Sequence, residues 1–269
     1  MRKRLIPFLL PLILAISAHA FEDPAPPAVN VLVNRIPGGA ETQVELTFHQ
    51  APKPLSPDAI TSDWKNFLGA THNAYSPETK LLKQFGEDGP NKLWEVSRGE
   101  GYASAAVIND RVIIFHRSES KEVVECLQAE TGKRYWKHAY SSRYSDRYGF
   151  GNGPRCRPVS DGEFVYTLGV EAQLHCIELS SGRVLWQRNL KEEFNLTLDF
   201  FGVAGAPLLE GDLLIINIGA PEGPCVAAFN KRTGKMVWGA GDEWGPSYSS
   251  PIPADTRAGR KIFVFAGGE

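Results

Sequence analysis

The stretch Thr131-Gly132-Lys133-Arg134-Tyr135-Trp136 decides the fold, because it recurs twice further along the chain. Its copies are Ser181-Gly182-Arg183-Val184-Leu185-Trp186 and Thr233-Gly234-Lys235-Met236-Val237-Trp238, and the three tryptophans are 50 and 52 residues apart. A repeat of this period is typical of folds in which one supersecondary unit is stacked many times. The glycine in each copy predicts a tight turn with a positive φ angle.

The residues before each turn predict three further short strands in every unit. The first strand is rich in small residues, and the second and third are apolar. First strands are expected at 104–107, 156–159, 205–208 and 249–252, second strands at 112–115, 164–168, 213–216 and 262–265, and third strands at 123–127, 174–179 and 226–229. Four short strands at this period predict an all-β fold, a β-propeller of four-stranded blades. The small residues of the inner strand suit a crowded central channel.

The tryptophans at the ends of the units are predicted to be structural. Each lies on the outer strand of a blade, where a large aromatic ring fills the gap to the next blade. Burial of one tryptophan removes on the order of 200 Å² from water and contributes several kcal/mol. The set consists of Trp94, Trp136, Trp186 and Trp238.

The number of units predicts an open arc of blades. Three full blades are expected at 102–140, 155–190 and 203–240, and two strands of a fourth after residue 248. Trp94 has no inner strands before it, so its strand is the N-terminal closing strand of a ring and is expected to have no partner here. A closed ring takes roughly 4–8 blades. We therefore expect the propeller to be truncated and the natural product to be longer by about 150–200 residues.

The first twenty residues have the three parts of a secretory signal peptide. A basic start at 1–4 is followed by an apolar run at 5–17, which is short for a membrane span, and by Ala18-His19-Ala20. Cleavage after this motif predicts a periplasmic or secreted product with no stable membrane span. Residues 21–62 are expected to form a proline-rich extension, and residues 63–269 the propeller.

Charge and cysteine content restrict the partners. Loss of the signal lowers Lys+Arg from 29 to 26 against 31 Asp+Glu, so the formal net charge moves from −2 to −5. A mildly acidic chain has no electrostatic footprint for nucleic acid. The four cysteines are well separated and are interpreted as small buried hydrophobic residues, with a disulfide or metal ligation as alternatives.

The turns and strands resemble the pyrroloquinoline-quinone (PQQ) repeat family of β-propellers. The lead-in at 63–69, 76–79 and 89–94, which reads Asp-Trp-Lys-Asn-Phe-Leu-Gly, Ser-Pro-Glu-Thr and Gly-Pro-Asn-Lys-Leu-Trp, is similar to the start of bacterial envelope proteins related to the assembly factor BamB. The resemblance covers residues 63–269. It implies a propeller that is either a quinoprotein dehydrogenase or a scaffold without catalysis.

The resemblance to quinoprotein alcohol dehydrogenases implies a vicinal disulfide, a calcium site with Glu and Asn, and a catalytic Asp. The chain has no Cys-Cys pair, and turn formation is sufficient to explain Asp110, Asp161 and Asp212. No catalytic residue, metal ligand or cofactor is therefore predicted, and the chain is interpreted as a protein without catalysis. PQQ with calcium belongs only to the alternative, a PQQ-dependent oxidoreductase.

The connection at 140–157 is the candidate binding segment. Loops on a rigid scaffold carry function, and Arg and Tyr dominate binding hot spots. The candidates are Tyr144, Arg147, Tyr148, Arg155 and Arg157. The alternative is that the loop packs on its own blades, with Arg stacked on Tyr. Our hypothesis is an exported scaffold that binds a protein or small ligand at the channel mouth in the cell envelope.

Overall fold

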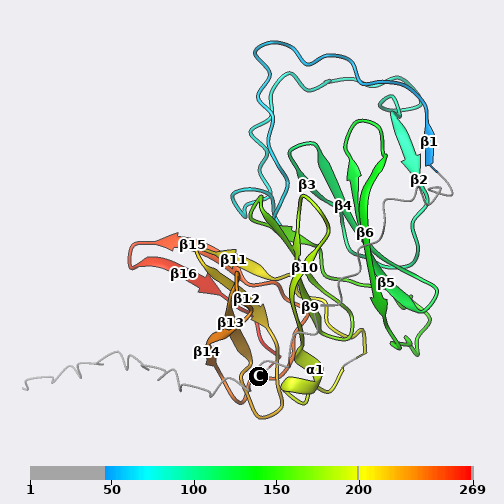
Figure 1. Ribbon diagram of the computed structural model, residues 1–269. Coiled ribbons are helices and arrows are strands. Elements are labelled where there is room, and N and C mark those ends of the chain that lie inside the picture. Colours follow the sequence, from blue (N-terminus) through cyan, green and yellow to red (C-terminus); the bar gives the residue numbers. More distant parts are fainter. Residues whose placement is uncertain (1–45, 199, 268–269) are drawn as a thin grey trace, which may run out of the picture.

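Three antiparallel sheets of four strands follow one another as blades (Figure 1). The computed structural model describes residues 46–198 and 200–267. The first blade contains β3 (Ala106–Ile108), β4 (Arg111–Ser118), β5 (Lys121–Gln128) and β6 (Arg134–Ser141); the second contains β7 (Val159–Ser160), β8 (Phe164–Leu168), β9 (Gln173–Glu178) and β10 (Val184–Asn189); the third contains β11 (Leu208–Glu210), β12 (Leu213–Asn217), β13 (Val226–Asn230) and β14 (Met236–Ala240). Strands pair in chain order within each blade, so the predicted four-stranded blades are confirmed.

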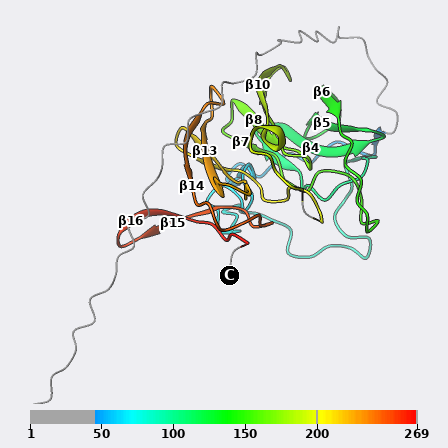
Figure 2. The same cartoon turned by 90° about the horizontal axis from the view of Figure 1, so that it is seen from below.

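Two strand pairs flank the three blades. β1 (Leu46–Phe48) pairs with β2 (Trp94–Val96), and β15 (Ile252–Thr256) pairs with β16 (Gly259–Phe263). In Figure 2 the β15–β16 pair lies beyond β13 and β14, on the opposite side of the molecule from β4, β5 and β6. Among the described residues β2 pairs with no strand of the C-terminal half, so the blades form an open arc, as predicted.

The strand of Trp94 does have a partner, contrary to the prediction. β1 provides it, and Leu46 lies beside Trp94 over the turn glycine of the first blade. A Cβ atom added to Gly132 would lie 2.7 Å from Cδ1 of Leu46 and 2.6 Å from Cδ2 of Trp94. Burial of these two side chains against the turn explains why residues far apart in sequence pair here.

The inner strands contact one another in succession, β3 with β7 and β7 with β11. The lead-in crosses their ends. Trp64 forms an antiparallel bridge with Val107 of β3, and the carbonyl of Lys65 accepts a hydrogen bond of 3.1 Å from the backbone N–H of Ser160 in β7. The lead-in therefore bonds to the inner strands of the first two blades.

A tryptophan–glycine contact joins each blade to the next. The rings of Trp94, Trp136 and Trp186 each lie under the turn glycine of the blade that follows, and each indole N–H donates to the carbonyl three residues before that glycine. These hydrogen bonds run from Trp94 to Ala129 (2.8 Å), from Trp136 to Leu179 (2.8 Å) and from Trp186 to Lys231 (3.0 Å). The glycines are required at this close approach, because an added Cβ would lie 2.6–2.7 Å from ring atoms.

The tryptophans differ in burial. Trp136 and Trp186 are 8% and 5% exposed. Trp238 is only half-buried, contrary to expectation, because it packs toward the two-stranded β15–β16 pair rather than a four-stranded blade. Trp94, between β1 and the first blade, is also half-buried. Packing between complete blades thus gives the deepest burial.

The four cysteines are free and buried, at positions 126, 156, 176 and 225. This agrees with their interpretation as small hydrophobic residues and not with a disulfide. The described ranges contain one four-residue helix, α1 (Leu190–Glu193), and no helix in them is long and apolar enough to cross a membrane. The predicted signal peptide and residues 21–45 of the extension lie outside the described residues.

Candidate functional site: an arginine–aromatic surface

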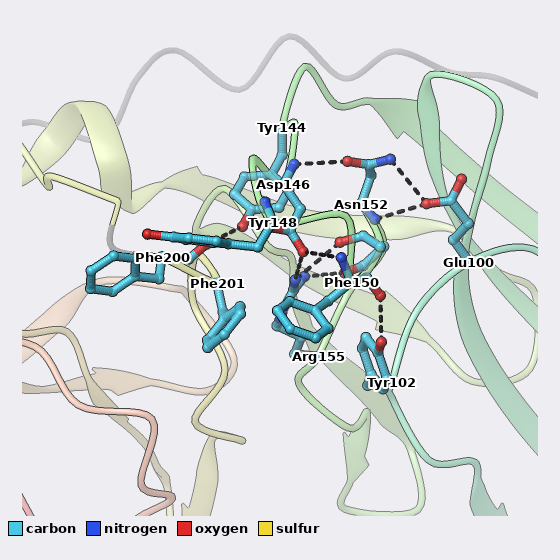
Figure 3. A network of polar contacts seen from close by, with 12 residues as sticks. Glu100, Tyr102, Tyr144, Asp146, Tyr148, Phe150, Asn152, Arg155, Phe200 and Phe201 are labelled. Atoms are coloured by element: carbon cyan, nitrogen blue, oxygen red, sulfur yellow. Dashed lines mark hydrogen bonds and ion pairs between the residues drawn. The ribbon is translucent and has the colours of Figure 1, made fainter.

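Aromatic side chains from several connections lie close together (Figure 3). They come from the connections that lead into the inner strand of each blade. We call this set the arginine–aromatic surface; it consists of Tyr102, Arg147, Tyr148, Phe150, Phe200, Phe201 and Tyr248. Between 41% and 61% of the surface of Tyr102, Tyr148, Phe150, Phe200 and Tyr248 is exposed. A contiguous exposed apolar set of this kind marks an interaction site more often than a random surface.

Phe201 is at the centre of the surface. Its ring centroid lies 5.8 Å from that of Phe150 in an edge-to-face arrangement and 5.7 Å from that of Tyr248. Tyr148 lies 5.5 Å from Phe200. The guanidinium of Arg147, an exposed residue, lies 5.2 Å from the ring of Phe200 and 5.5 Å from that of Tyr148. Both contacts hold this cation in place while leaving it in reach of solvent.

The buried carboxylate of Asp146 orders the loop that carries Arg147 and Tyr148. It accepts hydrogen bonds of 2.9 Å from the backbone N–H groups of Tyr148 and Phe150. The backbone N–H of Asp146 donates to the side-chain oxygen of Asn152 (2.8 Å), and the side-chain amide of Asn152 donates to the carboxylate of Glu100. A short Asx-type turn therefore fixes the loop from inside, as Asp residues commonly do.

Arg155 is part of the loop's interior and not of its exposed face. Its guanidinium donates to the carbonyls of Gly151 (3.0 Å) and Gly153 (2.8 Å) and lies 3.5 Å from Asp146. It also lies 5.3 Å from the ring of Tyr144. Its side chain is 8% exposed, so it has little capacity left for a ligand. The alternative of arginine stacked on tyrosine describes this residue.

Tyr144 is also a packing residue. It is 9% exposed, and its hydroxyl donates to the carbonyl of Phe200 at 2.8 Å. This bond ties the loop after the first blade to the connection after the second. Tyr102 makes a similar link, because its hydroxyl donates to the carbonyl of Phe150. The aromatic rings of the surface are therefore held by hydrogen bonds that run between connections.

Arg157 lies away from the surface, beside the inner strands. Its guanidinium donates to the carbonyl of Trp64 in the lead-in, and the residue is 4% exposed. Burial lowers the pKa of Arg157 to about 10. Of the five candidates from the sequence, Arg147 and Tyr148 are thus on the exposed surface, Tyr144 and Arg155 lie beneath it, and Arg157 is elsewhere.

Several residues of this region were not predicted from the sequence. Arg117 is the most connected of them: its guanidinium donates to the carbonyls of Tyr144 (2.6 Å), Asn152 (3.2 Å) and Ser142 (3.3 Å). The sequence does contain a signal for Phe200 and Phe201, because they are two adjacent aromatic residues in the connection that corresponds to 140–157. Arg117 had none, because strand-end arginines are common and its acceptors are backbone atoms.

The described residues do not fit the PQQ and calcium that the resemblance to dehydrogenases implies. The four cysteines are buried in separate places and form no vicinal disulfide. Within residues 46–198 and 200–267 no group of three His, Cys, Asp or Glu side chains is placed to hold a metal ion.

The chain is similar to proteins of known sequence or structure. Quinoprotein ethanol dehydrogenase of Pseudomonas aeruginosa is 28% identical over 203 residues, which are 67% of this chain and 30% of the dehydrogenase. The structure of BamB from Moraxella catarrhalis is 16% identical with a TM-score of 0.43 and covers 65% of this chain and 52% of BamB. Quinohemoprotein alcohol dehydrogenase from Comamonas testosteroni is 22% identical with a TM-score of 0.39, over 53% of this chain and 21% of the enzyme.

The chain thus spans less than a third of the curated relative that it matches. The family model described as outer membrane protein assembly factor BamB matches residues 120–269. This match contains the last two tryptophan–glycine contacts and most of the blade strands. Because it extends over more than half of the sequence, the chain belongs to this BamB-like, PQQ-repeat family of β-propellers.

Proposed function

We propose that the protein is an exported scaffold of the cell envelope, without catalysis of its own, that binds another protein through the arginine–aromatic surface. The observation that carries the proposal is the exposed ring set around Phe201, with Arg147 held over two of its rings. Tyr, Phe and Arg are enriched in the centres of protein interfaces. The positioned guanidinium suits a partner that brings a carboxylate among apolar side chains.

The shape of this region favours a protein partner over a small ligand. Small-molecule sites are concave and enclose most of the ligand. A depression of about 370 Å³ borders the same connections, but its lining contains none of the aromatic rings. The rings instead spread across four connections, where a protein segment covers them all at once.

A site-specific cross-linking experiment tests the proposal. A photoreactive amino acid replaces Tyr148 in the exported full chain, and cross-linked partners are identified by mass spectrometry. Tyr135 is the matched control position, because it is 45% exposed but lies on the outer strand of the first blade. We expect one dominant partner from position 148, lost on Arg147→Ala. Equal cross-linking from both positions would contradict a specific surface.

A quinone-dependent oxidoreductase is the second candidate, and the similarity to the ethanol dehydrogenase is the observation that favours it. Its test is the addition of PQQ and calcium to the purified full chain. Stoichiometric binding seen in the absorption spectrum, together with dye-linked alcohol oxidation, would replace the scaffold proposal. Under the scaffold proposal neither is expected.

A further inference from the structure

The turn Gly169–Ala172, between β8 and β9, connects the two loops that carry most of the surface. The carboxylate of Glu171 accepts hydrogen bonds from the hydroxyl of Ser142 (3.0 Å) and the backbone N–H of Arg143 (2.7 Å), at the start of the loop with Arg147. The carbonyl of Val170 accepts a bond of 3.0 Å from Val203, which follows Phe200 and Phe201. Any movement of this turn therefore moves both loops.

A buried acid of the first blade holds the turn. Oε1 of Glu122, on β5, accepts a hydrogen bond of 2.9 Å from the backbone N–H of Val170, and Glu122 is 0% exposed. The contact is close: a Cβ added to Gly169 would lie 2.1 Å from Oε2 of Glu122 and 2.5 Å from the hydroxyl of Tyr140. The fit leaves no room for a water molecule to replace the carboxyl group.

The hydroxyl of Tyr140 lies beside the carboxyl group of Glu122 and acts on it as a hydrogen-bond donor. His175 of β9 stacks on Tyr140 with ring centroids 4.3 Å apart. The other ionisable groups near the carboxyl group are Arg117 of β4, Glu171 of the turn and Cys156 before β7.

Ionisation of Glu122 is unfavourable while its carboxyl group is buried against the Gly169–Ala172 turn. Burial raises the pKa of Glu122, and the negative charge of Glu171 adds to the rise, while the bond from Val170, Tyr140 and the positive charge of Arg117 oppose it. A raised pKa means that, at low pH, the neutral acid stabilises the arrangement in which it holds the Gly169–Ala172 turn. This stabilisation is lost as pH rises through the raised pKa, because a buried carboxylate gains by reaching water.

We infer that Glu122 is a positioning residue for the arginine–aromatic surface: its neutral carboxyl group holds the Gly169–Ala172 turn, and its ionisation loosens the two loops that carry the rings. The inference rests on the proposed function only for the claim that the surface binds a partner protein. The effect of Glu122 on the loops is a property of the chain and can be measured without that partner.

Hydrogen exchange of single amides in the full chain tests this inference. In the wild-type protein the protection of the Val170 and Val203 amides, corrected for intrinsic rates, is expected to fall about tenfold as pH rises from about 5 to about 8. Glu122→Gln keeps the acceptor but does not ionise, so its protection is expected to be the same throughout this range. Glu122→Ala removes the acceptor and is expected to lower protection at every pH.

Glu125→Gln is the matched control. Glu125 is a buried acid on the same strand, 7% exposed, but it pairs with Arg134 and does not touch the turn. It is expected to keep the wild-type pH dependence at Val170. Wild-type pH dependence in Glu122→Gln would overturn the inference, even if Glu122→Ala fails to fold. A missing cross-link at Tyr148 alongside the expected exchange pattern would instead reject the proposed function alone.

Discussion

The interfaces on the two sides of the second blade are built alike at one end and differ at the other. Both contain the tryptophan–glycine contact, with Trp136 under Gly182 and Trp186 under Gly234. Toward the arginine–aromatic surface, the interface between the first and second blades becomes polar. At the equivalent positions the interface between the second and third blades is apolar and belongs to a single core cluster, although the buried guanidinium of Arg188 also lies in this interface, 4.9 Å from the ring of Phe229.

Strand register places the differing residues at equivalent positions. Trp136 pairs with Cys126 and Trp186 with Cys176, which aligns the first two blades, and Ala228, the partner of Trp238, aligns the third. In this register Glu122, Tyr140, Thr167 and His175 of the first interface correspond to Ala172, Leu190, Ile216 and Ala227 of the second. All four of the second set belong to the apolar cluster.

The comparison teaches that the repeat specifies the blade and that departures from it specify the site. Apolar side chains at all four positions are compatible with the fold, since the second interface has them. In the polar set of the first interface, the buried Oγ1 of Thr167 has no hydrogen-bond partner among the described residues. Buried polar groups of this kind call for an explanation beyond stability. Support of the nearby surface provides one.

Removal of a shared contact is expected to have the largest effect. Trp186→Ala deletes a 5% exposed ring between two complete blades, and we expect a loss of roughly 3–5 kcal/mol in the free energy of unfolding. Denaturant unfolding measures it, with Tyr135→Ala as the exposed aromatic control. A loss below about 1 kcal/mol would be incompatible with the blade assignment.

Exchange of one equivalent pair tests the difference between the interfaces. Ile216→Thr places a hydroxyl in the apolar interface, and we expect a cost of about 2–3 kcal/mol from lost packing and an unpaired polar group. Thr167→Ile makes the reverse change in the polar interface. It removes a hydroxyl that finds no partner among the described residues, so we expect a change within about 1 kcal/mol. Equal losses of unfolding free energy from the two substitutions would contradict this difference between the interfaces.

The polar interface is also expected to respond to acid. Burial lowers the pKa of His175 to about 3, so the folded protein holds this ring neutral. Its contribution to stability is complete above the ordinary pKa of about 6.5 and is lost as pH falls toward 3, by about 2 kcal/mol at pH 5. His175→Leu is expected to reduce this loss, measured as unfolding free energy against pH. The raised pKa of Glu122 acts in the opposite direction, so the comparison is best made with Glu122→Gln as background.

The repeat was sufficient to predict the blades, their strand order and the open arc, because turn glycines and strand patterns are local signals. The partner of the Trp94 strand was not predictable, since pairing of β1 with β2 joins residues 46 to 50 positions apart with no motif in β1. The same limit applies to the site. The aromatic content of the loop was visible, but Asp146 acts through backbone atoms of its own loop, and Arg117 and Glu122 act through backbone atoms of other segments.

The sequence likewise did not predict which arginines of the folded loop are exposed and which are buried. Arg147 and Arg155 have the same side chain and lie eight positions apart, yet one is exposed over aromatic rings and the other is buried on Asp146. Sequence reasoning grouped them with Arg157 as one cationic set. Only the hydrogen bonds and the exposure of each guanidinium show that Arg155 is a packing residue and that Arg147 is open to solvent.

The smallest expected effect on stability separates these two arginines. Arg147→Ala removes only an exposed guanidinium over the rings of Tyr148 and Phe200, so we expect less than about 0.5 kcal/mol of change in unfolding free energy. The loss of partner cross-linking from position 148 is expected to be nearly complete, since hot-spot arginines dominate binding. Arg155→Ala leaves Asp146 buried without its cation and is expected to cost about 3 kcal/mol.

Arg147 and Arg155 test the proposal because loss of the first is expected to affect binding and loss of the second is expected to affect stability. Arg147→Lys keeps the charge but loses the flat guanidinium that stacks on the rings, and it is expected to restore binding only in part. If Arg147→Ala unfolds the protein, the loop exists to close the gap between the first two blades. If it changes neither stability nor cross-linking, the partner binds elsewhere, and the aromatic rings are the exposed margin of the blade packing.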